Sequence, residues 1–269
     1  MVEFDAQAGQ GASGDAELSR EQLSADEVDL AAGLQGLSAM VDAGRGVETV
    51  LGEVAEFAAQ AIPGVDGTGV TLIQPVGATM GIQAWSVTAP FVREIDIIQY
   101  EALQEGPCIS CMQTRRAVVS GSLGADMRWP RFAAQAARLG VASVLSLPLL
   151  IGDQVVGSIN AYAHGPDVFG EHSVRLGSAF ARPAAVSVYN TQLLVRARER
   201  AQQLQRALDS RGAIDQAMGI IRGRLGCSAE EAFDRLRQIS MSDNSELYVV
   251  AQRFVDEAVR RAAARNRPS

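Results

Sequence analysis

The clearest pattern in the chain is a seam of mostly apolar positions between residues 186 and 225. Counting from Val186 in alternating steps of four and three gives twelve positions, nine of them apolar. A heptad pattern held for about five heptads predicts a long helix that packs against another long helix. Asn190, Arg200 and Arg211 interrupt the seam, and such polar positions set register while lowering stability. The pattern predicts a coiled-coil helix over 186–225, with a larger domain before it and a small helical unit after it.

Upstream of the seam the apolar period alternates between helix-like and strand-like. Helical spacing predicts helices over about 24–41, 46–62, 89–104 and 129–140, and a short one from Pro107. Short β-branched or alternating runs predict strands at 69–73, 81–87 and 117–120. The two-residue link Gly152-Asp153, between apolar runs at 141–151 and 154–163, predicts a β-hairpin. The order indicates an α+β fold, an antiparallel sheet flanked by helices.

Downstream of the seam the signals predict a three-helix bundle. Gly226 should end the long helix, and Ser228 with Glu231 forms a capping-box signature for a second. Asn244 is expected to be the N-cap of a third helix. Apolar residues recur at helical spacing along all three. On the second and third helices these are Ala229, Ala232, Phe233, Leu236, Ile239, Leu247, Val250, Ala251, Phe254, Val255, Ala258 and Val259.

Composition indicates a soluble chain. Apolar residues make up 47% of the 269, yet the longest apolar run, 141–151, is too short to cross a bilayer. The N-terminus lacks the basic region of a signal peptide, so we expect a cytoplasmic protein with no membrane contact. Residues 1–20 are expected to be disordered. Their GxGxxG at Gly9, Gly11 and Gly14 follows no predicted strand, which argues against a dinucleotide site.

All 24 basic residues are arginine, and this excludes chemistry that needs a lysine amine. The charge is unevenly distributed. Residues 196–269 hold 14 arginines against 10 acids, a net of +4, whereas residues 1–195 hold 10 against 21, a net of −11. This uneven charge distribution is a modest indication that the C-terminal part meets an anionic partner.

Residues of about 45–190 resemble a GAF domain, a small-ligand sensor module. The resemblance rests on the helix at 46–62, the strand GVTLI, the segment QEGPC at 104–108 and the hairpin at 147–163. It implies a pocket between the sheet and its covering helices, with Ser158 as a further polar contact. The candidate pocket residues, each of a kind that is more often simply part of a core, are Trp85, Tyr100, Trp129, Phe132 and Asn160.

The ligand of such a pocket is left open, and no cofactor is evident. The lysine-dependent pattern of cyclic-nucleotide GAF domains cannot occur in this chain. The cysteine-histidine attachment of bilin-binding members is absent as well, because Ile109 follows Cys108. A small-molecule effector therefore stays an open partner.

Residues of about 201–262 resemble an ANTAR domain, an RNA-binding transcription antiterminator module. Its three-helix pattern matches at positions such as Ala217, Gly219, Ala232, Leu236 and Ser240. Many members carry lysine where this chain has Met218. The resemblance implies a structured, two-hairpin RNA as partner, and RNA binding needs exposed cations. The candidate RNA-binding residues are Arg211, Arg222, Arg224, Arg235, Arg237 and Asn244. The alternative is a solvated face with i,i+4 pairs Glu231–Arg235 and Asp256–Arg260.

Cysteines and histidines give no catalytic or metal motif. Cys108 and Cys111 form a C-x-x-C at a predicted helix start, which is compatible with redox sensing or with two structural thiols. With only Cys227, His164 and His172 besides, a metal site is not indicated. No catalytic triad pattern is present, so we expect no enzymatic activity.

Together these patterns predict a disordered tail at 1–20, a sensor domain at 21–190, a signalling helix at 186–225, an RNA-binding domain at 201–262 and a basic tail at 263–269. The leading hypothesis is a cytoplasmic, homodimeric antitermination regulator in which the GAF domain controls RNA binding. The helix would be a dimer helix in its first half and a bundle helix in its second, and a switch between these packings would carry the signal. The alternative hypothesis is a dimeric interaction protein that binds no nucleic acid.

Overall fold

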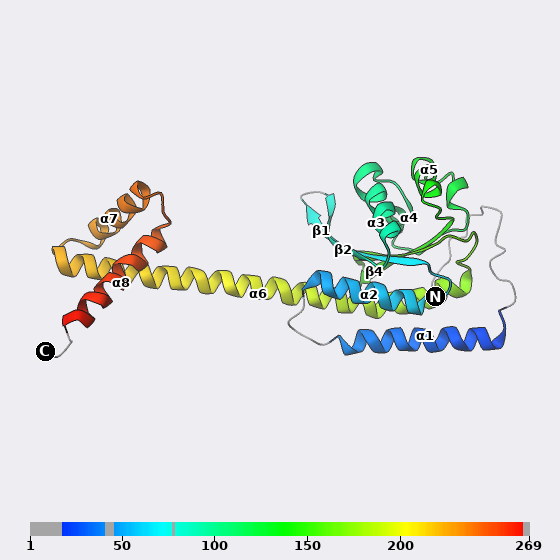
Figure 1. Cartoon of the computed structure of the whole chain (residues 1–269), viewed down its shortest axis with the longest axis horizontal. Coiled ribbons are helices and arrows are strands. Elements are labelled where there is room, and N and C mark those ends of the chain that lie inside the picture. Colours follow the sequence, from blue (N-terminus) through cyan, green and yellow to red (C-terminus); the bar gives the residue numbers. More distant parts are fainter. Residues whose placement is uncertain (1–17, 41–45, 77–78, 266–269) are drawn as a thin grey trace. The chain divides into compact units, whose positions relative to one another are not determined.

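A computed structural model describes residues 18–40, 46–76 and 79–265 (Figure 1). Most of the predicted disordered tail, including the GxGxxG glycines, lies outside these residues, as does the end of the predicted basic tail after 265. The chain divides into two compact units, Met1–Val195 and Arg196–Ser269. Helix α6, Glu171–Leu225, contributes to both and contains the predicted seam without interruption, with Pro183 inside it.

The first unit is built on a five-stranded antiparallel sheet of order β2-β1-β5-β4-β3. The strands are β1 (Gly67–Val76), β2 (Thr79–Val87), β3 (Val118–Ser120), β4 (Ser143–Ile151) and β5 (Gln154–Ala163). All five fall where the sequence predicted them, and the predicted β4–β5 hairpin turns at Gly152-Asp153. The α+β prediction is confirmed.

Helices cover both faces of this sheet (Figure 1). On one face, α2 (Val47–Ala61) and the start of α6 pack against alternate strand residues such as Leu72, Leu147 and Ile159. Helix α1 (Arg20–Ala39) lies against α2. On the other face lie α3 (Pro90–Ile97), α4 (Pro107–Thr114) and α5 (Pro130–Arg138), around a core that includes Ile95, Phe132 and Tyr162. Because strand side chains alternate between faces, the strands contribute side chains to the cores on both sides of the sheet.

The predicted helix at 89–104 differs from the structure in where its α-helical part ends and in how polar its buried face is. Helix α3 ends at Ile97 and continues as a π-helical segment, Ile98–Leu103, which ends at Gln104 in the left-handed conformation. Its inward face is also more polar than predicted, since Ile95 is buried but so are Asp96, Gln99 and Tyr100. The wider π-helical turn places Gln99 and Tyr100 side by side toward the sheet, and such segments are frequent at functional sites.

The second unit is a three-helix bundle. The end of α6, α7 (Ala229–Ser242) and α8 (Leu247–Arg265) enclose a small core that includes Ala217, Ile221, Leu236 and Val250. Gly226 follows α6 at φ +66° as predicted. The Ser228–Glu231 capping box is present, with both reciprocal hydrogen bonds formed.

The bundle differs from prediction in its apolar faces and at Asn244. Ala229, Phe233 and Val259 belong to the predicted apolar faces but are exposed, Phe233 to 38% and Val259 to 63%, so the core is formed by the other members of these faces. Asn244 is not the N-cap of α8. It adopts φ +47° directly after α7, where the Ser245 N–H bonds to the Ser240 carbonyl at 3.0 Å. This is a Schellman termination of α7, so Asn244 ends the second helix.

Candidate nucleic-acid interface and sensor core

The first unit contains a fully buried polar cluster between its sheet and α3, α4 and the π-helical segment. The Tyr100 hydroxyl lies 2.9 Å from Thr71 Oγ1, 3.0 Å from Asn160 Nδ2 and 2.6 Å from Cys108 Sγ. Cys108 Sγ also lies 2.8 Å from Ser158 Oγ. These side chains come from β1, β5, α4 and the π-helical segment, so the cluster joins the covering helices to the sheet.

Strand register explains how the sequence assembles the cluster. Ser158, Asn160 and Tyr162 alternate along β5, so their side chains share one face of the sheet. Thr71 of β1 is directly opposite Ser158, and Ser146 of β4 is directly opposite Asn160. The Ser146 hydroxyl accordingly donates to Asn160 Oδ1 at 2.9 Å. The neighbouring strand thus supplies a partner for Asn160, whereas Ser158 and Tyr162 find theirs in Cys108 of α4 and Asp96 of α3.

Gly106 makes the approach of α4 to the cluster possible. Its φ is +151°, and a Cβ there would lie 2.2 Å from Gln99 Oε1. That oxygen accepts the Cys108 N–H at 2.9 Å, one of the otherwise unbonded donors at the start of α4. Any larger residue at 106 would separate Gln99 from this backbone donor.

Asp96 is the one buried carboxyl in the cluster. Its Oδ1 accepts the Tyr162 hydroxyl at 2.7 Å, whereas Oδ2 has no hydrogen-bond partner among the described residues and lies where a Cβ at Gly69 would be only 2.6 Å away. Burial raises the pKa of Asp96 from 3.8 to about 7, because desolvation disfavours the charged form, and the Tyr162 hydrogen bond offsets only part of this. The carboxyl can therefore change charge near neutral pH inside the core.

The two cysteines of the C-x-x-C are buried thiols. Desolvation raises the pKa of Cys108 to about 11 and that of Cys111 well above its usual value. A redox-sensing thiol at a helix N-terminus would need the opposite shift, toward the thiolate. The structure thus favours two structural thiols, with Cys108 serving as a hydrogen-bonding member of the cluster.

The five predicted pocket residues lie in three different environments. Tyr100 and Asn160 belong to the polar cluster, while Trp129 and Phe132 pack in the hydrophobic core around Ile95. Trp85 lies on β2 under the Arg93 guanidinium, 5.6 Å from the ring centroid. Within the described ranges, no group of three or more His, Cys, Asp or Glu residues could hold a metal ion.

Sequence reasoning missed Asp96, Gln99, Thr71, Ser146 and Tyr162. One signal could have found part of the cluster: QVVGSINAYA reads as a buried strand, yet it carries polar residues at every second position from Ser158. Polar groups on a buried strand face need partners, and that need predicts a polar network. Asp96 and Gln99 gave no such signal, because a polar residue in a helix is normally taken as exposed.

The second unit presents its arginines to solvent. The six predicted RNA-binding residues are all exposed, on α6, on α7 and in the α7–α8 turn, and they are Arg211, Arg222, Arg224, Arg235, Arg237 and Asn244. Arg253 differs, since it forms an ion pair with Asp243 at 2.9 Å.

The ion pairs that would have neutralised this surface are not formed. The Glu231 carboxylate accepts the Ser228 N–H at 2.8 Å in the capping box and makes no ion pair with Arg235. Asp256 accepts a hydrogen bond from Gln252 at 2.9 Å and makes no ion pair with Arg260. Among the described residues, none of the five predicted RNA-binding arginines is engaged in an ion pair. Their charge is available to an external anion.

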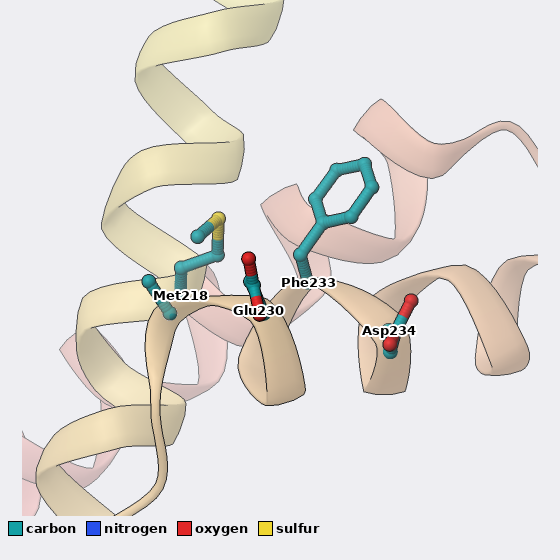
Figure 2. A pocket seen from close by; sticks show the side chains of 5 residues that line it. Met218, Glu230, Phe233 and Asp234 are labelled. Carbon is teal, nitrogen blue, oxygen red and sulfur yellow. The ribbon is translucent and has the colours of Figure 1, made fainter.

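Met218 lies at a different kind of surface. It lines a hollow of about 340 Å³ together with Ala229, Glu230, Phe233 and Asp234 (Figure 2). A lysine at this position would stand beside two carboxylates. With methionine, the surface is apolar with an acidic border.

Comparisons with known proteins agree with this division. A sequence model of the GAF domain matches residues 44–188, more than half of the chain. The chain belongs to the GAF domain family. A model of the ANTAR domain matches residues 202–255, so the ANTAR domain follows the GAF domain. Both resemblances seen in the sequence are confirmed, and a sensor module followed by an RNA-binding antiterminator module is a regulatory combination.

Solved structures similar to the chain share little of its sequence. The free methionine-R-sulfoxide reductase of Neisseria meningitidis is 12% identical, with a TM-score of 0.48 over 65% of this chain and 95% of that one. The GAF domain of an Acinetobacter phosphoenolpyruvate-protein phosphotransferase is 14% identical, with a TM-score of 0.47 over 64% and 97%. None of the curated proteins matches the chain. No described helix is long and apolar enough to cross a membrane.

Proposed function

We propose that this chain is a cytoplasmic, non-enzymatic antitermination regulator whose ANTAR domain binds a structured, two-hairpin RNA under the control of its GAF domain. The observation that carries the proposal is the set of exposed arginines on the ANTAR domain that have no ion-pair partner among the described residues. Phosphate attraction dominates RNA affinity, and arginines without an internal partner lose no ion pair when they meet phosphate. The proposed contacts are Arg211, Arg222, Arg224, Arg235 and Arg237, with Asn244 as a hydrogen-bonding residue.

A homodimer joined along α6 is the proposed functional form. The seam residues Val186, Leu193 and Leu204 are 49%, 45% and 60% exposed, although they are large and apolar. A second α6 in parallel register would cover them, and the polar seam positions Asn190 and Arg200 would fix the register. The proposed signal route is a shift in how this helix packs, biased by the state of the GAF domain.

The GAF domain is proposed to take its input at the polar cluster beneath α3 and α4. Within the described part of the chain, Asp96 Oδ2 and Gln99 Nε2 are buried there without hydrogen-bond partners, so a small polar effector offering a donor and an acceptor would satisfy both. The cluster contacts α4 and the π-helical segment. An effector that rearranges it would therefore move the helices on that side of the sheet.

Gel-shift titration with two-hairpin RNAs tests the proposal. The double variant Arg222→Glu/Arg224→Glu should weaken RNA binding at least about tenfold, since each reversed charge repels phosphate, and the salt dependence should become shallower. The matched control, Arg138→Glu/Arg182→Glu, makes the same charge change at exposed arginines of the GAF domain and should bind normally. Equal binding by both variants, or no salt-sensitive binding by the unaltered chain, would refute RNA recognition.

The second candidate is an interaction protein that binds no nucleic acid. The apolar, acid-bordered hollow at Met218 favours it, because such a surface suits protein better than phosphate. If the Arg222→Glu/Arg224→Glu variant keeps its oligomeric state and the unaltered chain binds no RNA, this candidate replaces the first.

A further inference from the structure

The hollow beside Met218 leaves an aromatic ring uncovered on the ANTAR domain. Its neighbours in α7, Ala232 and Leu236, are fully buried, yet Phe233 is 38% exposed. Figure 2 shows Met218 of α6 and Phe233 of α7 on either side of Glu230. The opening measures about 340 Å³, enough room for one or two side chains of a partner.

The border of this hollow is acidic. Glu230 and Asp234 are one turn apart on α7, and among the described residues neither carboxylate has a hydrogen-bond or ion-pair partner. Like charges at this spacing repel each other, so a cation placed between them would relieve that cost. The domain around them is net positive, which makes the patch an exception to its surroundings.

These features together describe an arginine-binding surface. A guanidinium can stack on an aromatic face while it donates hydrogen bonds to carboxylates, and its three-carbon stem can cover apolar surface. An RNA base could also stack on Phe233, but its phosphates would then approach two carboxylates. The charge therefore favours a basic protein segment over RNA.

This chain carries a segment of that chemistry. Residues 260–267 hold four arginines and no acidic residue. Arg260, on α8, is exposed and has no partner in the described ranges, while Arg261 is bonded to Glu257. Figure 1 shows the last turns of α8, which end at Arg265, on the opposite side of α6 from α7, so the described part of the segment is directed away from α7 in the same copy.

We infer that the hollow lined by Met218, Phe233, Glu230 and Asp234 docks the arginine segment 260–267 of a second copy of this chain. Hollow and segment are both present on every copy, so two copies can exchange the contact symmetrically. The contact is distinct from the proposed RNA contacts in its residues, because none of the six proposed RNA-binding residues lines the hollow.

Fluorescence anisotropy with a labelled peptide of residues 258–269 tests the inference on the full chain. The unaltered chain should bind the peptide, and binding should weaken as salt is raised. The variant Glu230→Gln/Asp234→Asn should bind on the order of tenfold more weakly, through loss of two charges beside a stacked guanidinium. Phe233→Ala should also weaken binding. A peptide with all four arginines replaced by lysine should bind less well, since lysine lacks the planar group.

The matched control is Asp215→Asn/Glu246→Gln, which removes two acids of the same domain that are likewise exposed. It should bind the peptide normally, and circular dichroism should show that every variant is folded. Equal peptide affinity of the two double variants would overturn the inference, as would no binding by the unaltered chain. RNA binding is measured in parallel: if Glu230→Gln/Asp234→Asn loses RNA but keeps the peptide, the hollow belongs to the RNA site and the inference is wrong. Absence of RNA binding by every variant would leave the peptide result standing and remove only the proposed function.

Discussion

Replacement of Asp96 by asparagine should remove a specific pH dependence from the stability of the GAF domain. The folded-state pKa of Asp96 is raised from 3.8 to about 7, so the folded state holds this proton more tightly than the unfolded state does. The stabilisation is fully present below pH 4 and is lost as pH rises through 7. A difference of about three pKa units corresponds to about 4 kcal/mol, or about 1.4 kcal/mol per pH unit inside the window.

Urea unfolding of the full chain, followed by tryptophan fluorescence, measures this directly. Both tryptophans, Trp85 and Trp129, lie in the GAF domain, so the signal reports its unfolding alone. Asp96→Asn keeps the shape of the side chain without its charge. The free energy of unfolding of the variant, minus that of the unaltered chain, should rise by up to about 4 kcal/mol between pH 4 and pH 8.

A difference in the free energy of unfolding that is the same at every pH does not matter, because the amide at position 96 forms other hydrogen bonds than the carboxyl whatever the pH. Only the change with pH tests the reasoning. Asp153→Asn, in the exposed β4–β5 turn, is the control and should show no such change. A difference between Asp96→Asn and the unaltered chain that is the same at pH 5 and pH 8 would refute a neutral Asp96 in the folded core.

Two further outcomes follow from the described contacts. In the native chain at pH 7.5, iodoacetamide should modify the partly exposed Cys227 first, because Cys108 and Cys111 are buried thiols. Mass spectrometry should find Cys108 and Cys111 modified only at the slow rate of global opening, in oxidised and reduced samples alike. Fast modification of Cys108 would restore the redox hypothesis. Ser228→Ala should destabilise the ANTAR domain by about 1 kcal/mol, because the capping-box hydrogen bond to Glu231 is lost; thermal unfolding followed by circular dichroism measures this. Ser228→Thr keeps the hydroxyl and should leave the stability unchanged. An equal loss of stability in both variants would exclude the cap as the cause.

The sequence predicted the parts of the fold that depend on local signals. The seam, the Gly152-Asp153 hairpin and the Ser228–Glu231 capping box each follow from short-range geometry that tertiary packing does not override. The Asn244 prediction failed for an informative reason. Asparagine suits both the N-cap and the left-handed position that follows a helix, and the Ser245–Ser240 bond decides for the second.

The sensor cluster was harder to predict, because its members lie far apart in the chain. Tyr100 and Asn160 are separated by 60 residues, and only the packing of the π-helical segment on β5 brings them within 3.0 Å. The sequence indicated both as pocket residues through the family resemblance alone. Nothing local indicated that Asp96 would be buried, since a helical aspartate is exposed far more often than not.

The close approach of Asp96 to the bare backbone of Gly69 has a consequence for how this sequence can change over time. An alanine at 69 would place its Cβ 2.6 Å from Asp96 Oδ2, so that substitution is admissible only after the carboxyl has been replaced by something shorter. A substitution at 96 can come first, because a smaller residue there is compatible with glycine at 69. Substitutions at the two positions are therefore non-additive and directional, and in descendants of this chain an acid at 96 should be found only together with glycine at 69.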